Sequence, residues 1–395
     1  MTNRRTIGVA ACVAILLCAF SLGGAARVGS GLPFDPAQGR QAGTSPTPPS
    51  AVFPGKDWQR IEKPEAIGYS PARLAALRAW LQSLDTTAMT VSVGGQSLFE
   101  YGDLTRLSYL ASVRKSVLAI LYGKYVENGT ISLNKTLKEL DFTDVGGLMP
   151  QELNATVENL LTARSSVYHP ASNSGDDTAS APPRGSQRPG SYYLYNNWDF
   201  NAAGAAFEKM TGRDIYDALE SDLARPIGMQ DFDRARQRKS GDASRSQFLA
   251  YHMWFSTRDM ARIGLLMLRE GNWAGQQLVS RAWARRISSL VTPLNEMNPP
   301  VHRALGTGMR WGYGYLWWVW DAPNSPGPFR GAYTGIGAGG QFITVLPELD
   351  MVVAHKTDMS DPIPNSKRSR TVSRTEYDAI LRMLISARCP GGKCE

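Results

Sequence analysis

The order of helix and strand patterns along the chain constrains its fold more than any single motif does. A helical pattern over residues 70–84 and a hairpin pattern over residues 88–101 come first, and the region 133–286 is mostly helical in pattern. The last third returns to strand patterns and ends in a helix. We therefore expect an α+β fold in which both chain ends form one antiparallel sheet, flanked by helices, with a mostly helical middle region.

Capping and turn residues mark the ends of these elements. Ser70 is an N-cap followed by proline, and Gly94-Gly95 joins the two strands of the hairpin. An N-cap at Ser256 and a capping box that begins at Ser373 open two further helices. Strands in the last third are predicted over residues 313–320, 341–346 and 351–355.

The N-terminal region carries a signal for export. Arg4 and Arg5 precede an apolar run over residues 7–22, which small residues follow. This order is typical of a secretory signal peptide, so residues 1–26 are predicted to be one, either cleaved or retained as an N-terminal anchor. Residues 27–66 are rich in proline and glycine and predict an exposed linker. We expect an exported protein, located in the periplasm or outside the cell.

The remaining residues, 67–395, are long enough for one large domain with a buried core. The chain is 43% hydrophobic and 20% charged, which is typical of globular proteins and excludes a disordered or multi-span membrane protein. Its net charge is +8, but the basic residues are scattered and not interleaved with aromatic ones. We therefore expect no nucleic-acid partner.

Cysteine and glycine patterns bear on cofactors. Cys389 and Cys394 flank a short turn, and in an oxidising compartment they would close a terminal loop; two unpaired thiols are the open alternative. No Cys-x-x-Cys or His-Glu-x-x-His spacing indicates a metal. Residues 335–340 satisfy Gly-x-Gly-x-x-Gly but lead into a strand, which is the wrong context for a dinucleotide. We expect neither a metal nor an organic cofactor.

A serine and a lysine three residues apart begin an apolar helical pattern. Ser112 and Lys115 would project from the same side of its first turn. A buried lysine has a lowered pKa and can take the proton that a serine must lose to become a nucleophile. Ser132 and Lys135 have the same spacing but begin a polar stretch, so we prefer Ser112. The alternative is an N-cap serine with a surface lysine.

Two further patterns lie downstream. Tyr195 and Asn197 precede a helix, where a tyrosine near an ammonium group can act as a base and an asparagine can orient a lysine or a substrate amide. Their alternative roles are a core tyrosine and a helix cap. Tyr333, Gly335 and Ile336 begin a glycine-rich strand edge that would let backbone N–H groups approach a ligand, as an oxyanion hole requires. On its own this pattern is no more than a turn.

Taken in this order, the three patterns resemble those of the class C beta-lactamase and penicillin-binding-protein-like serine hydrolase family, over most of residues 69–387. The resemblance implies a beta-lactamase/transpeptidase-like fold. It also implies that Ser112 forms an acyl-enzyme, that Lys115 is its base, and that Tyr195 relays a proton to the leaving group.

The same resemblance assigns the binding residues. Asn197 matches the asparagine of the family's second motif, and the N–H groups of Ser112 and Ile336 would form the oxyanion hole. Where the family usually carries Lys-Thr-Gly or His-x-Gly, this chain has Tyr333-Thr334-Gly335, with residues 337–339 as a competing alignment. The cation that grips a substrate carboxylate is therefore missing from this strand, unless an arginine elsewhere replaces it.

This departure favours the esterase and amidase branch, which includes enzymes similar to 6-aminohexanoate-dimer hydrolase. We expect a serine hydrolase of the cell envelope that acts on a small-molecule ester or amide, with beta-lactams and peptides as further candidate substrates. The rival functions are a catalytically silent envelope protein that binds peptidoglycan or a partner, and a scaffold anchored in the membrane through residues 7–22. The intact set of Ser112, Lys115 and Tyr195 argues against a silent protein.

Two segments are candidates for shaping the site. Residues 170–190 form a long polar loop, and we expect it to cover the site as a lid. Four alternating aromatic residues follow the pattern of one strand face, and core packing is a better explanation for them than a substrate wall; they are Trp311, Tyr313, Tyr315 and Trp317.

Overall fold

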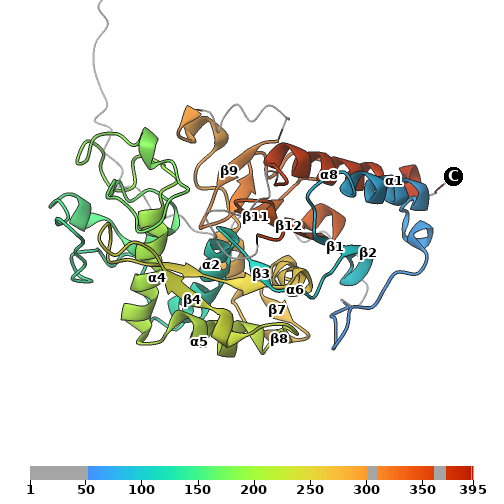
Figure 1. Cartoon of the computed structure of the whole chain (residues 1–395), viewed down its shortest axis with the longest axis horizontal. Helices are drawn as coiled ribbons and strands as arrows, with labels where there is room; N and C mark the ends of the chain where they lie inside the picture. Colours follow the sequence, from blue (N-terminus) through green and yellow to red (C-terminus); the bar gives the residue numbers. More distant parts are fainter. Residues whose placement is uncertain (1–51, 301–308, 360–370, 393, 395) are drawn as a thin grey trace, which may run out of the picture. The chain divides into compact units, whose positions relative to one another are not determined.

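The computed structural model describes residues 52–300, 309–359, 371–392 and 394. The predicted signal and most of the predicted linker lie outside these residues. Seven strands form one antiparallel sheet in the order β2-β1-β13-β12-β11-β10-β9 (Figure 1). Their bounds are β1 Ala88–Val93, β2 Gln96–Gly102, β9 Trp311–Tyr313, β10 Trp318–Trp320, β11 Tyr333–Gly337, β12 Gln341–Leu346 and β13 Met351–Lys356. The first hairpin pairs with the last strand, as β1 lies beside β13, so the predicted α+β fold is confirmed.

Helices pack on both faces of the sheet. On one face, α8 (Arg374–Ser386) lies alongside α1 (Pro71–Leu81), and the hydroxyls of Tyr377 and Thr344 are 2.7 Å apart (Figure 1). On the other face lie α2 (Val113–Glu127) and α6 (Thr257–Leu268). A Cβ added at Gly264 of α6 would meet the Val352 side chain at 2.3 Å, which shows how closely this helix approaches the strands.

The middle of the chain supplies the remaining helices and three short strand pairs. The helices are α3 Val157–Leu161, α4 Asn197–Thr211, α5 Ile215–Leu219 and α7 Arg281–Ile287. The strand pairs are β3 (Ser108–Tyr109) with β6 (Trp254–Phe255), β4 (Arg238–Ser240) with β5 (Ala250–His252), and β7 (Asn272–Trp273) with β8 (Gln276–Gln277). Because α2 is buried along most of its length between the sheet and these helices, its N-terminus lies where the two regions meet.

Local sequence accounts for the element boundaries. Gly94 and Gly95 have φ angles of 63° and 84°, which only glycine adopts without strain, and they turn β1 into β2. The Ser256 side chain accepts a hydrogen bond from the Asp259 amide, and Ser373 forms the predicted capping box with Glu376. These caps begin α6 and α8 where the sequence predicted helices.

The aromatic run does not lie on a single strand as predicted. It divides into β9 and β10, with Tyr313 paired to Trp318 across a hairpin, and the Gly314 amide donates to the Trp317 carbonyl at 2.8 Å to close the turn. Period-two alternation looks the same on one long strand and on two short ones, so sequence periodicity did not reveal this turn. The four aromatic residues are buried, as the core-packing interpretation expected.

The last part of the predicted linker also differs from the exposed tether expected there. Arg262 of α6 donates a hydrogen bond to the Gly55 carbonyl at 2.7 Å, and the rings of Phe53 and Trp273 meet edge to face at 5.2 Å. Large apolar side chains within a proline-rich segment therefore anchor residues 52–66 to the domain.

The C-terminal cysteines pair with each other. Cys389 and Cys394 form a disulfide, which decides between the two alternatives that the sequence left open. Among the described residues, no helix has both the length and the apolar character needed to cross a membrane.

Candidate active site

The candidate nucleophile lies at the junction between β3 and α2. Ser112 occupies the N-cap position, but its side chain accepts no capping hydrogen bond from the helix backbone. Ala111, directly before it, has a φ of 47°, a left-handed conformation that is strained for a residue with a Cβ. The chain thus enters α2 through a sharp turn that leaves the Ser112 hydroxyl available for other contacts.

Lys115 lies at the centre of a polar cluster. Its Nζ is 3.0 Å from Ser112 Oγ, 2.7 Å from the Tyr195 hydroxyl and 2.8 Å from Asn197 Oδ1. The structure therefore brings together residues that are 80 or more positions apart in sequence, alongside the local pair Ser112 and Lys115. Ser132 and Lys135, in contrast, lie in a turn outside the helices and their side chains share no hydrogen bond.

The three contacts of Lys115 limit where its protons can be. Asn197 Nδ2 donates to the Ser174 carbonyl at 2.9 Å, so the amide oxygen is the atom that faces Lys115. That oxygen can only accept a hydrogen bond. A neutral Lys115 therefore points its lone pair at one of the two hydroxyls, and the geometry lets it receive the proton of Ser112.

Burial favours neutral forms of both titratable groups in this cluster. It lowers the pKa of Lys115 well below the ordinary value, and the nearby Arg114 guanidinium lowers it further, while Asp176 and Asp177 act in the opposite direction. Burial raises the pKa of Tyr195 to about 12. The lysine is thus easier to deprotonate than a free lysine, and the tyrosine stays a phenol.

Arg114 is a charged residue that sequence reasoning missed. It is 1% exposed, and its Nη2 donates to Asn201 Oδ1 at 3.3 Å. Its guanidinium lies 5.0 Å from the centre of the Tyr251 ring. Within the described part of the chain it forms no ion pair. Nothing in the sequence distinguishes this arginine from a surface residue, because its burial depends on α4 and β5.

The long loop of residues 170–190 supports the second motif. Asp176 Oδ2 accepts the Asn197 amide at 2.8 Å, and the Asp177 amide donates to the Tyr195 carbonyl at 2.9 Å. With the Ser174 carbonyl on the Asn197 side chain, three loop residues hold the segment that faces Lys115. The contribution of this loop to the site is therefore positioning; whether it also opens and closes as a lid stays a prediction.

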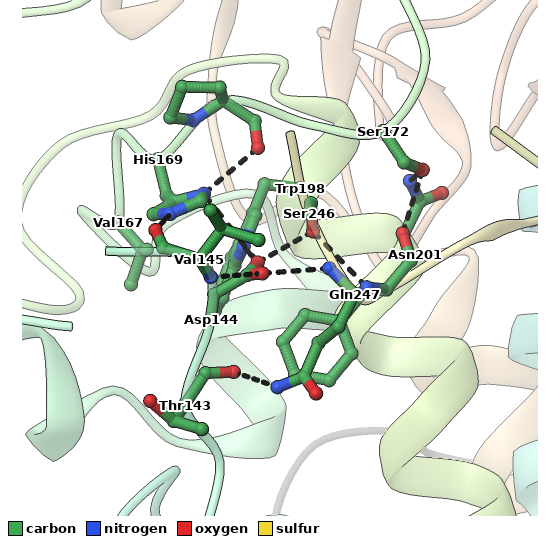
Figure 2. Close-up of polar contacts among 12 residues, drawn as sticks. Thr143, Asp144, Val145, Val167, His169, Ser172, Trp198, Asn201, Ser246 and Gln247 are labelled. Atoms are coloured by element: carbon green, nitrogen blue, oxygen red, sulfur yellow. Dashed lines mark hydrogen bonds and ion pairs between the residues drawn. The ribbon is translucent and has the colours of Figure 1, made fainter. Parts of the chain in front are cut away.

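Figure 2 shows how the beginning of this loop is held. Asp144 Oδ2 accepts hydrogen bonds from Trp198 Nε1 and Ser246 Oγ, each at 2.6 Å. His169, directly before the loop, has its Nε2 2.7 Å from the carbonyl oxygen of Val145. Because Trp198 is the second residue of α4, the network fixes the loop and the beginning of α4 relative to each other.

The third predicted pattern lies on β11, and its side chains divide between two environments. Tyr333 is buried, with its ring edge-on to Trp317 at 5.3 Å, so its side chain belongs to the core and not to the Lys115 cluster. A Cβ added at Gly335 would lie 3.0 Å from Ser116 Oγ, which shows how closely β11 approaches α2. Gly335 therefore lets β11 pack closely against α2, because a side chain at this position would crowd Ser116.

The backbone N–H group of Ile336 on β11 lies at the edge that faces β10, beyond the last residue that β10 pairs with. The Trp320 amide donates to the Ala332 carbonyl, so Ala332 faces β10, and strand alternation turns Ile336 to the same edge. β10 pairs no further than Thr334, which leaves Ile336 beyond its end. A Cβ added at the next residue, Gly337, would lie 3.2 Å from the Ser112 amide nitrogen. The predicted pair of oxyanion donors therefore lies at one place in the fold.

Comparison with known families agrees with this architecture. A family model described as Beta-lactamase matches residues 79–369, which is most of the chain. The chain belongs to the beta-lactamase family. Members of this family are generally serine hydrolases, and they include esterases, amidases and proteins like the penicillin-binding proteins. The family resemblance and the fold predicted from the sequence are both confirmed.

Several solved structures of other proteins share the fold at low sequence identity. A Bacillus anthracis protein, named as a 6-aminohexanoate-dimer hydrolase, aligns with a TM-score of 0.59 and 21% identity over 85% of this chain and 87% of its own. A Mycobacterium bovis beta-lactamase gives 0.51 and 18% over 79% and 96%. The hydrolase EstCE1 gives a TM-score of 0.54 and 13% identity over 80% of this chain and 97% of its own. Comparison with curated proteins gives no match.

Within the described ranges no group of three or more histidine, cysteine or acidic residues is arranged to hold a metal ion. The chemistry that this site offers comes from a hydroxyl, an amine, a phenol and backbone N–H groups, which is the equipment of covalent acyl transfer.

Proposed function

We propose that this protein hydrolyses an ester or amide bond through an acyl-enzyme on Ser112. The observation that supports it most is the position of Lys115 Nζ, which lies within 3.0 Å of Ser112 Oγ and 2.7 Å of the Tyr195 hydroxyl. A base that touches both the nucleophile and a phenol can take a proton from one and return it through the other.

Acylation begins when neutral Lys115 removes the proton from Ser112 Oγ and this oxygen attacks the substrate carbonyl carbon. The carbonyl oxygen becomes an oxyanion, and the N–H groups of Ser112 and Ile336 stabilise its negative charge. The bond from the carbonyl carbon to the leaving group then breaks, and the leaving group takes a proton from the Tyr195 hydroxyl, which Lys115 reprotonates. The base is neutral again, and Ser112 carries the acyl group as an ester.

Deacylation repeats these steps with water as the nucleophile. The water gives a proton to the Tyr195 oxygen while Tyr195 passes its own proton to neutral Lys115, and the water oxygen attacks the acyl carbon. The bond from the acyl carbon to the Ser112 oxygen then breaks, and Lys115 returns the proton to Ser112. The products are the free acid and the unchanged serine. The raised pKa of Tyr195, about 12, keeps a proton on the phenol throughout the physiological range.

The test is intact mass spectrometry after treatment with an uncharged fluorophosphonate, which reacts with activated serines. We expect one adduct on the wild type and on S132A, and none on S112A. S132A is a matched control because Ser132 and Lys135 repeat the serine-lysine spacing outside the site. Turnover of p-nitrophenyl esters and of a chromogenic cephalosporin then separates esterase from beta-lactamase activity.

An absence of adduct on folded wild type would contradict the proposal. It would instead support a catalytically silent envelope protein that uses the same residues for binding. An adduct that persists in S112A would place the nucleophile elsewhere.

We also propose that the protein acts after export, in the periplasm or outside the cell. Two arginines followed by the apolar residues 7–22 support this, as does the disulfide between Cys389 and Cys394, because disulfides persist in oxidising compartments. N-terminal sequencing of the mature protein from separated cell fractions tests it. A new N-terminus near residue 27 in the soluble fraction indicates cleavage, an intact N-terminus in the membrane fraction indicates an anchor, and cytoplasmic recovery contradicts export.

A further inference from the structure

The residue directly before the long loop is a buried histidine whose two ring nitrogens both face hydrogen-bond acceptors. His169 is 3% exposed. Its Nδ1 is 2.9 Å from the Pro170 carbonyl oxygen and 3.5 Å from Asp144 Oδ2, and its Nε2 is 2.7 Å from the Val145 carbonyl oxygen (Figure 2). A neutral imidazole donates from one nitrogen and carries a lone pair on the other. Only the doubly protonated ring can donate on both sides of this site.

The other two histidines in the described part of the chain are also buried, but each has a partner that can donate to a lone pair. His252 Nδ1 is 2.8 Å from the Tyr109 hydroxyl, and His355 Nε2 is 2.9 Å from the Thr86 hydroxyl. Burial lowers the pKa of His252 to about 3 and that of His355 to about 4, so both rings are neutral at pH 6. His169 therefore differs from them in its partners and not in its burial.

Asp144 supplies the negative charge beside this ring. Its carboxylate accepts four hydrogen bonds, from the amides of Val145 and Gln247 at 2.8 Å each and from Trp198 Nε1 and Ser246 Oγ at 2.6 Å each. An ionised carboxylate, which only accepts, satisfies all four donors. Burial favours the neutral forms of two other titratable groups in these segments, raising the pKa of Asp199 on α4 well above its ordinary value and that of Tyr168 to about 12. The ring of His169 thus faces one carboxylate and two carbonyl oxygens.

A short stretch of chain connects this ring to the second motif. Pro170 begins the loop, and four residues later the Ser174 carbonyl accepts from Asn197 Nδ2 at 2.9 Å. This contact turns the amide oxygen of Asn197 toward Lys115, 2.8 Å away. Asp176 Oδ2 accepts the backbone amide of the same asparagine at 2.8 Å. A displacement of the loop at Pro170 would therefore disturb the group that directs the lone pair of Lys115.

We propose that His169 is a positioning residue that acts as an imidazolium and holds the beginning of the loop where Ser174 and Asp176 orient Asn197. The proposal rests on the proposed function, since it gives Asn197 a part in the proton transfers of Lys115. As the pH rises the ring loses one proton, and one nitrogen then directs its lone pair at a carbonyl oxygen. This repulsion loosens the loop, so fewer molecules have Asn197 in place.

The pH dependence of hydrolysis distinguishes this role from the chemistry of the catalytic pair. Lys115 acts as a neutral amine, so a rise in pH favours it, and the pKa of Tyr195, about 12, lies above the working range. These two groups alone predict activity that rises with pH and then levels. Loss of the charge on His169 adds a fall in kcat/KM below about pH 9, where histidines lose their charge. We call this fall the alkaline limb.

The first test is nitrogen-15 NMR of the histidine rings at pH 6, which reports whether each ring nitrogen carries a proton. We expect a doubly protonated ring in the wild type whose signals H169Q removes, and neutral rings for His252 and His355. His302 lies outside the described residues, and H302Q assigns its signals. A neutral His169 ring at pH 6 would overturn the proposal, and this result does not depend on any hydrolysis.

The second test is the pH profile of kcat/KM for 4-nitrophenyl acetate. H169Q places an amide near the position of Nε2 and H169N near that of Nδ1, so each keeps one donor and neither carries a charge. We expect both to lower kcat/KM about tenfold at pH 6 and to lack the alkaline limb. The loss is smaller than the roughly 100-fold that a displacement of about 1 Å can cause. H355Q is the matched control and should keep the alkaline limb, because His355 is already neutral at pH 6.

The outcomes separate this proposal from the proposed function. An alkaline limb that persists in both H169Q and H169N would overturn the role of His169 while leaving hydrolysis intact. A wild type that hydrolyses the ester without an alkaline limb would overturn it as well, even if neither variant folds. If the wild type forms no fluorophosphonate adduct and hydrolyses no ester, the proposed function fails and the positioning role fails with it, whereas the NMR spectra still decide the protonation of His169.

Discussion

Two buried helices on the same face of the sheet begin with a serine and carry a charged residue three positions later. On α6, Ser256 accepts the Asp259 amide at 3.2 Å, and the Asp259 carboxylate accepts the backbone amides of Gln230 and Asp231 at 2.8 and 3.0 Å. On α2, Ser112 caps nothing, and its hydroxyl faces Lys115. The same spacing thus serves structure on one helix and leaves reactive groups available on the other.

The backbone before each helix produces this difference. Ser256 has an extended conformation with ψ of 164°, which aims its side chain at the free amides of the first turn. Ser112 has ψ of −7°, after the left-handed Ala111, and so its side chain is directed elsewhere. Burial shifts both charged residues toward their neutral forms, raising the pKa of Asp259 to about 6 and lowering that of Lys115. On α6, backbone amides donate to the Asp259 carboxylate and offset the cost of its burial. On α2, the partners of Lys115 include two hydroxyls that can exchange protons with it.

Removing the α2 hydroxyl should have the largest effect on activity. We expect S112A to lower kcat/KM by at least about 10⁴-fold, the scale seen when a nucleophile is removed from a serine hydrolase. Because no capping bond is lost, its free energy of unfolding should stay within about 0.5 kcal/mol of wild type. Ester turnover and urea denaturation measure the two effects. A large loss of stability would show that Ser112 caps α2 after all.

Removing the α2 amine separates catalysis from stability. We expect K115M to acylate about 10³-fold more slowly, within the range attributed to a general base. Because the pKa of Lys115 is lower in the folded protein than its ordinary 10.5, burial of this group destabilises the fold fully below the folded pKa. The penalty shrinks as pH rises toward 10.5 and disappears above it.

K115M should therefore melt at a higher temperature than wild type near neutral pH, with an advantage that narrows in alkaline buffer. Thermal unfolding at several pH values measures this. K135M, at the serine-lysine pair outside the site, is the control and should change neither the acylation rate nor the melting temperature. A K115M protein that is less stable than wild type at neutral pH would contradict the inference that burial of Lys115 destabilises the fold.

Replacing Arg114, on the same helix, should change activity less than replacing Lys115. The charged and titratable groups that act on Lys115 are Arg114, Asp176, Asp177 and Tyr195, and Arg114 is the cation among them. Without it the pKa of Lys115 rises, so R114M should shift the acidic limb of the kcat/KM profile to higher pH and lower activity about tenfold at neutral pH. R114K keeps the positive charge, so the acidic limb of its kcat/KM profile should return to the wild-type pH. An unshifted limb in a folded R114M protein would assign Arg114 to packing alone.

The comparison of the two helices also shows what sequence reasoning could reach. The beginnings of α2 and α6 were predictable because caps and apolar spacing are local, and the pair Ser112 and Lys115 was predictable for the same reason. That both chain ends share one sheet followed from the order of patterns, although the pairing of β1 with β13 did not. The division of the aromatic run into β9 and β10 was not predictable, because both arrangements produce the same alternation.

The residues that sequence reasoning missed share a physical property. Asp176 and Arg114 act on the site through contacts between elements that are distant in sequence, and each lies in an ordinary local pattern. Arg114 follows the nucleophile by two positions, yet its importance comes from burial against α4, which spacing does not report. Tyr195 and Asn197 were singled out as a pattern in the sequence, but their relation to Ser112 came from the family resemblance.

The capping serine of α6 should show the smallest effect on activity. S256A leaves the buried Asp259 amide without its acceptor, so we expect a loss of about 1 kcal/mol in the free energy of unfolding and kcat/KM within about twofold of wild type. Urea denaturation together with ester turnover measures both. S112A and S256A would then show opposite profiles at equivalent positions of two helices. A large loss of activity in folded S256A would mean that the α6 cap also positions the site, because β6, which leads into α6, pairs with β3, the strand before Ser112.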